Sequence, residues 1–264
     1  MIIVTPISEL FESKEEGELL AGLSNSLESR PDFPIEICSQ HPVTHGHISD
    51  PALDVNLVWS ETERCQIHRY LDSNLPSSTL SFHLARDYQT ATMDNLGRYL
   101  PVGQAMTEDE MVSNAVENCD WISSQFGRRI LIENNNYYNN GAYEAVGRPD
   151  FISRVVMETG AGFLFDYAHA LVSAVNMGRS LNDYASGLPM HKVEQLHVSE
   201  PTVVSLEAVD SHGLPTAEMV QEAVSFVIGF GAAPPPVTVE YYKSAARLAG
   251  LLKGLRVENQ RQPR

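Results

Sequence analysis

The feature that most constrains the fold is a series of short apolar runs, each of which delivers an ionisable side chain at or just after its end. In Phe163-Leu-Phe-Asp166-Tyr-Ala-His169 the run ends on an Asp, and a His follows three residues later. The comparable positions elsewhere in the chain are His83, Glu133, His197 and Glu240. Because amphipathic helical stretches separate these runs, the pattern predicts a parallel sheet whose strands are joined by crossover helices.

Seven or eight strand candidates in 264 residues favour a closed barrel over an open sheet. We therefore predict the α/β class and a single (β/α)8 TIM barrel spanning residues 1–264, with a frayed tail at 256–264. The expected helices cover residues 14–28, 61–75, 107–126, 149–159, 180–186, 215–228 and 243–255. Less regular β-like runs are expected at 2–5, 35–38 and 43–48.

Two segments are predicted to be loops on the side of the barrel that carries function. Residues 87–104 show no clear periodicity, and the Asn- and Tyr-rich residues 134–141 are typical of an exposed loop. We regard residues 87–104 and 134–143 as candidate docking surfaces.

Composition narrows the classes of function. A net charge of −16 with scattered Lys and Arg residues disfavours a nucleic-acid partner. Cys38, Cys65 and Cys119 are widely spaced, which indicates neither a disulfide framework nor a thiolate metal site and fits a reducing cytoplasm. The chain has no secretory signal pattern at its start and no apolar run of about 18 residues, so no membrane association is expected.

The ionisable residues at the ends of the predicted strands, or just beyond them, form a candidate metal site. They are His45, His83, Glu133, Asp166, His169, His197, Asp210, His212 and Glu240. In a TIM barrel these positions converge on the C-terminal mouth. Four carboxylates at one mouth would repel one another unless divalent cations compensated their charge. Imidazole and carboxylate ligands without thiolate suit iron, zinc or manganese.

Each of these residues also has an ordinary structural interpretation, and it is their number that favours a site. Among the other histidines, His41, His68 and His191 are expected to be structural. His47 lies on the same strand face as His45, and either of the two fits as the ligand. Asn134, Ser173 and Asn176 are candidates for orienting ligands and equally for turn or cap positions.

Several of these motifs together carry a family likeness. The segments that carry it are His45-Gly46, Ser81-Phe-His83-Leu-Ala, Glu133-Asn134, the run from Thr159 through Asp166 to Gly178, Gln195-Leu-His197 and Asp210-Ser-His212-Gly213-Leu-Pro215. Over roughly residues 45–240 the chain resembles the multinuclear non-heme iron-dependent oxidases. That family includes the iron oxidases of methanobactin biosynthesis and of thia-amino-acid peptide maturation.

The resemblance implies a xylose-isomerase-like barrel and three ion positions. The first ion would be held by His45, His83 and Glu133. The second would be held by Glu133, Asp166, His197 and Glu240, and the third by His169, Asp210 and His212. Asp166, Asp210 and Glu240 are also expected to be catalytic. Two or three iron ions of mixed Fe(II)/Fe(III) state, with O2 as co-substrate, would modify a residue, by expectation Cys, of a ribosomally made precursor peptide (RiPP biosynthesis). A separate peptide-recognition protein would form a heterodimer with the enzyme.

Three other functions remain open. Many family members have Asn where this chain has His169, and the Asp-x-x-His-Ala pattern at 166–170 is closer to the trinuclear zinc endonuclease barrels. A zinc phosphodiesterase of the abasic-site endonuclease type, a related sugar isomerase and a metal-dependent binding module are therefore the alternatives.

Overall fold

The structure is a computed structural model that describes residues 1–7, 14–23, 26–30, 43–73, 77–204 and 207–261. The expected strand at 35–38, together with Cys38 and His41, lies outside these residues.

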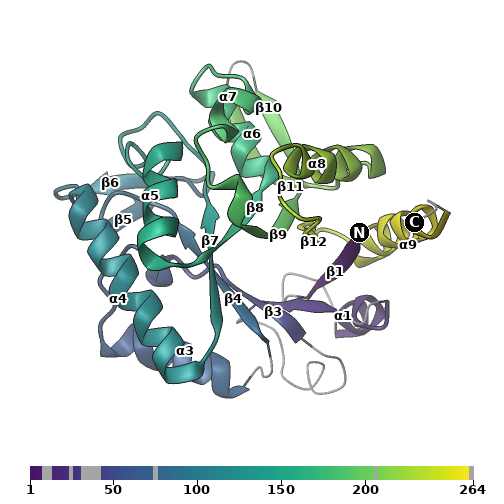
Figure 1. Cartoon of the computed structure of the whole chain (residues 1–264), viewed down its shortest axis with the longest axis horizontal. Helices are drawn as coiled ribbons and strands as arrows, with labels where there is room; N and C mark the ends of the chain where they lie inside the picture. Colours follow the sequence, from purple (N-terminus) through teal and green to yellow (C-terminus); the bar gives the residue numbers. More distant parts are fainter. Residues whose placement is uncertain (8–13, 24–25, 31–42, 74–76, 205–206, 262–264) are drawn as a thin grey trace.

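Eight parallel strands close into a barrel in the order β1-β12-β9-β8-β7-β4-β3-β2. Figure 1 shows the strands at the centre of the molecule with helices around them. The barrel strands are β1 (Ile2–Ile7), β2 (Leu27–Ser29), β3 (Val43–Ile48), β4 (Thr79–Leu84), β7 (Arg129–Asn134), β8 (Gly162–Asp166), β9 (Val193–Val198) and β12 (Pro236–Val239). The predicted TIM-barrel fold is therefore confirmed.

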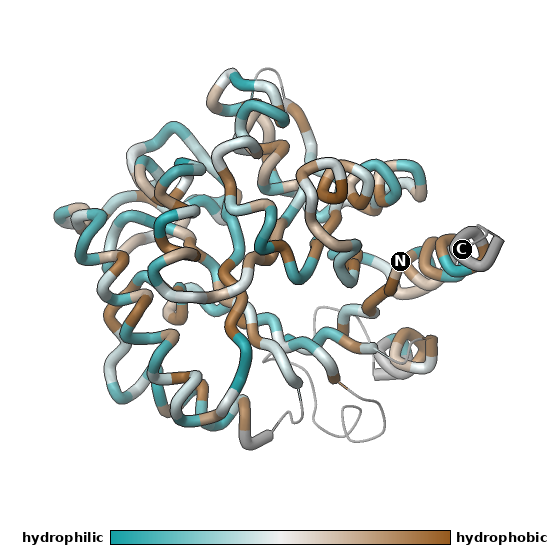
Figure 2. Tube along the Cα trace, viewed as in Figure 1, coloured by the Kyte–Doolittle hydropathy of each residue, from teal (hydrophilic) through white to brown (hydrophobic). Residues whose placement is uncertain are grey.

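Helices pack on the outside of the barrel, and along their tubes hydrophobic and hydrophilic residues alternate (Figure 2). They are α1 (Lys14–Ala21), α3 (Glu61–Ser73), α4 (Glu108–Phe126), α5 (Pro149–Thr159), α6 (Tyr167–Asn176), α7 (Leu181–Ala185), α8 (Ala217–Gly229) and α9 (Ala245–Arg261), with single 3-10 turns η1 (Pro51–Leu53) and η2 (Met190–Lys192). This alternation lets one face of each helix bury apolar side chains against the sheet.

The alternation of side chains along the strands separates an apolar outer layer from a polar interior. On β9, Leu196 and Val198 are buried in the hydrophobic core, whereas the buried Gln195 and His197 alternate with them and so face the opposite side of the sheet. On β3, the buried His45 and His47 likewise share one face. The barrel lumen is thus filled by hydrogen-bonding side chains near the mouth, which is unusual for an ordinary barrel core.

Helix prediction succeeded where capping residues mark the helix start. α4 begins at the predicted position because Thr107 and Glu110 form a reciprocal capping box. The predicted helix at 14–28 is too long, since α1 ends at Ala21 and Leu27–Ser29 forms β2 between β1 and β3. The tail predicted to fray from residue 256 is helical up to Arg261.

Two hairpins interrupt the barrel pattern. Residues 87–104 are not a loop, because β5 (Thr90–Met93) and β6 (Tyr99–Val102) form an antiparallel hairpin, drawn at the left of Figure 1. After β9, β10 (Glu200–Val204) and β11 (Glu207–Gly213) form a second hairpin that contacts α6. The prediction that 134–141 is exposed was also wrong, since Asn134, Asn136 and Tyr138 are buried.

Candidate metal centre

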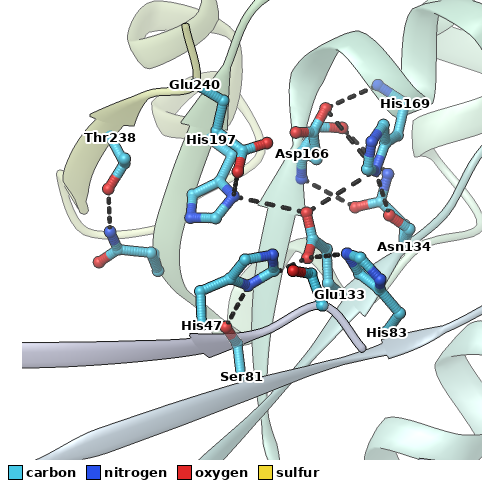
Figure 3. A network of polar contacts seen from close by, with 12 residues as sticks. His47, Ser81, His83, Glu133, Asn134, Asp166, His169, His197, Thr238 and Glu240 are labelled. Carbon is cyan, nitrogen blue, oxygen red and sulfur yellow. Dashed lines mark hydrogen bonds and ion pairs between the residues drawn. The ribbon is translucent and has the colours of Figure 1, made fainter. Parts of the chain in front are cut away.

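The strand ends bring a cluster of imidazoles and carboxylates together at the C-terminal mouth of the barrel. Figure 3 shows these side chains pointing toward one another from separate strands. His83 comes from β4, Glu133 from β7, Asp166 from the end of β8, His197 from β9 and Glu240 from the residue after β12.

The centre of the cluster is formed by Glu133, Asp166, His197 and Glu240, all buried, whose donor atoms lie within 4.8 Å of one another. His197 Nδ1 is 3.4 Å from Glu133 Oε1 and 3.6 Å from Glu240 Oε1. Asp166 also caps α6, because its Oδ1 accepts a hydrogen bond from the His169 amide at 2.6 Å. These four predicted residues therefore meet closely enough to bind one ion.

A second group shares Glu133 and contains His83 and His47. His83 Nε2 lies 3.1 Å and His47 Nδ1 lies 3.6 Å from Glu133 Oε2. Glu133 therefore presents one oxygen to each group, the arrangement expected of a carboxylate that bridges two ions.

The structure places His47, rather than the predicted His45, beside His83 and Glu133. His45 lies deeper in the barrel, with Nδ1 2.7 Å from Thr79 Oγ1 and Nε2 2.8 Å from Ser81 Oγ. Its nitrogens also approach those of His47 and His197. Hydroxyl groups already bond both ring nitrogens of His45, so of the two histidines that the sequence left open we propose His47 as the one that shares an ion with His83 and Glu133.

The third predicted group lies at the outer edge of the mouth. Asp210 Oδ2 is 3.3 Å from His169 Nε2 and 3.3 Å from His212 Nδ1. Asp210 and His212 are on the hairpin strand β11, and His212 has φ 42, a left-handed conformation that is uncommon for a residue with a side chain. Among the described residues, these three do not form as compact a donor group as the two inner ones.

Five atoms in the cluster that could bind a metal ion are buried and have no hydrogen-bond partner among the described residues. They are Glu133 Oε1, Glu133 Oε2, Asp166 Oδ2, His47 Nε2 and His197 Nδ1. Buried polar atoms are normally satisfied, and leaving one unpaired costs about 1–3 kcal/mol. Their convergence therefore fits bound cations, and the donor set contains the imidazole and carboxylate groups that iron, zinc and manganese accept.

The electrostatics of the cluster agree with this interpretation. Burial opposes ionisation of Glu133, but the adjacent His47 and His83 rings outweigh it and hold the pKa of Glu133 well below its usual value. Burial, with the neighbouring carboxylates Glu133 and Glu240, raises the pKa of Asp166 to about 7. Without added positive charge the cluster therefore cannot keep every carboxylate ionised at neutral pH.

Two charged residues that the sequence interpretation missed, the buried Glu28 and the half-buried Arg30, support the cluster from β2 and just beyond. Glu28 Oε2 accepts hydrogen bonds from His197 Nε2 at 2.9 Å and from Thr238 Oγ1 at 2.7 Å. Arg30 donates to Glu240 Oε1 at 2.6 Å and to the Tyr242 hydroxyl at 3.0 Å. The signal that could have found them is the Leu27-Glu-Ser run, an apolar residue followed by an acid, but it is only three residues long.

The three predicted orienting residues act on the backbone around the site. The Asn134 side chain bonds both the amide and the carbonyl of Asp166, at 2.9 and 3.0 Å, so it fixes the end of β8 against β7. Ser173 Oγ accepts from the Tyr137 amide, and the Asn176 amide group bonds Tyr137 and Ala208. Ser173 and Asn176 thus attach the 134–143 segment and β11 to α6.

A cavity of about 340 Å³ opens over the cluster. The residues that line it on the side of the cluster are His83, His169, Asp210, His212, Glu240 and Arg30. Its walls include Tyr138, Tyr143 and the tip of the β5–β6 hairpin at Leu96 and Gly97. The cavity gives a small extended ligand direct access to the outer members of the cluster.

The fold and the site define a TIM barrel with a candidate metal centre at its C-terminal mouth. The family model for the RiPP precursor modification enzyme MbnB/TglH/ChrH matches residues 60–261. The chain therefore belongs to this family of peptide-modifying enzymes.

Curated relatives of the chain include UPF0276 proteins. A UPF0276 protein of Rhizobium meliloti is 30% identical over 167 residues, which cover 61% of this chain and 52% of that protein. A UPF0276 protein of Bordetella pertussis is 26% identical over 194 residues, covering 70% of this chain and 64% of that protein. The chain thus spans between about half and two thirds of these two relatives.

Solved structures share the fold at low sequence identity. The 3-keto-D-glucoside 4-epimerase YcjR of E. coli gives a TM-score of 0.60 at 12% identity, covering 97% of this chain and all of that one (100%). Endonuclease IV of Thermus thermophilus gives a TM-score of 0.60 at 12% identity, covering 99% and 100%. At this identity the likeness concerns the fold alone.

Proposed function

We propose that this chain is an iron- and O2-dependent oxidase that modifies a cysteine residue of a ribosomally synthesised precursor peptide. Family membership supports the peptide-modifying class. The observation that carries the proposal is the convergence of unpartnered buried imidazole and carboxylate atoms on Glu133, next to His83 and Glu240, which line an open cavity.

Three groups of residues would hold the ions. They are His47, His83 and Glu133; then Glu133, Asp166, His197 and Glu240; then His169, Asp210 and His212. Bound iron would supply the electron transfer to O2 that protein side chains cannot perform.

The protein itself would bind the peptide, orient the ligands and limit water. Arg30 donates to Oε1 of the Glu240 carboxylate, and Glu28 accepts from Nε2 of the His197 ring. His83 and His212 are partly exposed toward the cavity, so a peptide side chain would reach the cluster beside them. The buried rings of Tyr138 and Tyr143 would close one wall against solvent.

The proposal includes a separate peptide-recognition protein as a heterodimer partner and a cytoplasmic location. The partner is suggested by the family resemblance, and the location by the scattered cysteines. Within the part of the chain that the structure describes, no helix has the length and apolar character needed to cross a bilayer.

Metal analysis of protein purified without oxygen, followed by O2 uptake with Cys-bearing peptides encoded beside the chain, tests the proposal. We expect two or three irons per chain, visible charge-transfer absorption and peptide-dependent O2 consumption. Stoichiometric zinc with cleavage of abasic DNA would instead identify a phosphodiesterase. Bound metal with no O2 uptake on any peptide would identify a binding module.

A further inference from the structure

The β5–β6 hairpin presents one open backbone edge next to the site cavity. The amide of Asp94 bonds the carbonyl of Arg98, so that pair is hydrogen-bonded and the next pair, Met93 with Tyr99, is not. The backbone N–H and C=O groups of Met93, and of Ala91 two residues earlier, therefore point away from β6. In the described part of the chain β5 pairs only with β6, so this edge carries no further strand.

The opposite edge of the hairpin is closed. The Tyr99 amide donates to the Tyr143 hydroxyl at 2.6 Å, and the Tyr99 carbonyl accepts from Asn140 Nδ2 at 2.8 Å. Pro101, which pairs with Ala91 across the hairpin, has no N–H to offer on that side. The two edges thus differ: side chains and a proline protect β6, whereas β5 remains a template for strand addition.

A second cavity, of about 580 Å³, lies along the open edge. Ala91, Met93 and the exposed Val58 line it, and it shares Pro51, Met93 and Tyr99 with the cavity over the metal cluster. Met93 and Val58 are 48% and 61% exposed, so two apolar side chains face solvent here. The open edge therefore runs from the candidate metal centre into an adjoining cavity.

Beside this second cavity, the side-chain amide of Gln89 pairs with the backbone of Val58 as a peptide group would. The Val58 amide donates to Gln89 Oε1 at 2.9 Å, and Gln89 Nε2 donates to the Val58 carbonyl at 3.2 Å. The Gln89 side chain is exposed and lines the cavity. A primary amide that pairs with both backbone groups of one residue imitates an antiparallel strand partner. The backbone groups of Val58 are therefore already occupied, and the open backbone edge that lines this cavity is that of Ala91 and Met93.

We propose that the precursor peptide binds in an extended conformation as an added strand on the open edge of β5, with its modified residue over the metal cluster. This inference rests on the proposed function for the identity of the occupant. Main-chain hydrogen bonds to Ala91 and Met93 would supply affinity, as in other cases of strand addition. The second cavity would accept side chains from alternate positions of the peptide.

Substitution of Ala91 provides a sharp test. Ala91→Pro removes the outward N–H at a position where an edge strand tolerates proline, and Ala91→Val keeps the N–H as a matched control. The probe is an mRNA-displayed library of peptides with one fixed Cys between random residues, selected on the wild-type chain. We expect Ala91→Pro to bind the selected peptides roughly tenfold more weakly, and Ala91→Val to bind within about twofold of wild type.

Amide hydrogen exchange on the wild-type chain supplies a readout that does not depend on a variant folding. Addition of a selected peptide is expected to protect the Ala91 and Met93 amides. Equal affinity of wild type and Ala91→Pro, no selected peptides, or unchanged exchange would overturn the inference. So would a dimer of this chain that Ala91→Pro dissociates, because the edge would then join two copies.

The two proposals fail separately. If peptides bind at β5 but no oxidation follows with iron, the proposed oxidase function fails and the strand-addition site stands. If Ala91→Pro oxidises and binds peptide as wild type does, the strand-addition site fails and the oxidase function stands.

Discussion

At the scale of single residues, the candidate site depends on which nitrogen of each His carries its proton. Ser81 Oγ lies 2.8 Å from both His45 Nε2 and His47 Nδ1, and Thr79 Oγ1 donates to the Thr44 carbonyl while bonding His45 Nδ1. One consistent arrangement follows: Thr79 accepts from His45 Nδ1–H, Ser81 donates to His45 Nε2, and His47 Nδ1–H donates to Ser81. The lone pair of His47 then lies on Nε2, the atom left without a hydrogen-bond partner.

Removal of the Ser81 hydroxyl should weaken metal binding without removing a ligand. In Ser81→Ala, His47 loses the partner that fixes its tautomer, and such orienting contacts are worth about 10- to 100-fold in metal affinity. We expect roughly tenfold weaker binding in a chelator competition titration. Ser78→Ala, an exposed serine just before the same strand, is the control and should bind as wild type. Equal affinity of Ser81→Ala and wild type would contradict the assignment.

Glu28 should act on the cluster through His197. Its carboxylate accepts from His197 Nε2, which leaves Nδ1 to face Glu133 and Glu240. Glu28→Gln keeps the size but loses the charge, so we expect about a tenfold loss of metal affinity in the same titration. Glu200→Gln, at an exposed position on β10, is the control. An unchanged metal affinity in Glu28→Gln would show that Glu28 only completes hydrogen bonds inside the barrel and does not act on the metal centre.

At the residue scale, the sequence located ligand candidates most directly where an apolar run precedes them. His83, Glu133, Asp166 and His197 follow runs long enough to be recognised as strands, and all four meet in the structure. The choice between His45 and His47 could not be made, because both lie on one face of β3 and only depth in the barrel separates them. That depth depends on the register of β3 against β4.

At the scale of elements, local sequence signals predict where some helices begin but do not predict the short strands. The capping box at Thr107 predicts the start of α4, and tertiary packing is not needed to find it. β2 is only three residues long, and β5 and β6 have four residues each, with Pro101 inside β6. Hydrophobic periodicity cannot identify strands this short. A proline inside the run also argues against assigning it as a strand.

Loss of the α4 cap should destabilise the fold without affecting the metal centre. Thr107→Ala removes the hydroxyl that accepts from the Glu110 amide, so we expect the free energy of unfolding to fall by about 1 kcal/mol. Urea unfolding measures this change. Thr107→Ser keeps the cap and should stay close to wild type. A loss of metal content in Thr107→Ala that exceeds the stability effect would contradict the separation of cap and site.

At the scale of the whole molecule, the barrel explains how residues distant in sequence form one site. Glu28 and Glu240 lie more than two hundred residues apart, yet both contact His197 because the closed strand order places β9 beside β12 across the lumen from β2. Alternation of strands and helices predicted the parallel sheet, and the number of strand candidates in 264 residues predicted its closure. The β5–β6 and β10–β11 hairpins, which contribute to the cavity, were not predicted, because no sequence pattern indicated them.

We propose that the mouth of the barrel holds an iron cluster built around Glu133. Anomalous diffraction at the iron and zinc absorption edges, from crystals of protein purified without oxygen, tests it most directly. We predict iron peaks between His47, His83 and Glu133 and among Glu133, Asp166, His197 and Glu240. A mouth without anomalous peaks, or one occupied by zinc alone in a chain that consumes no O2, would show that there is no iron cluster at Glu133.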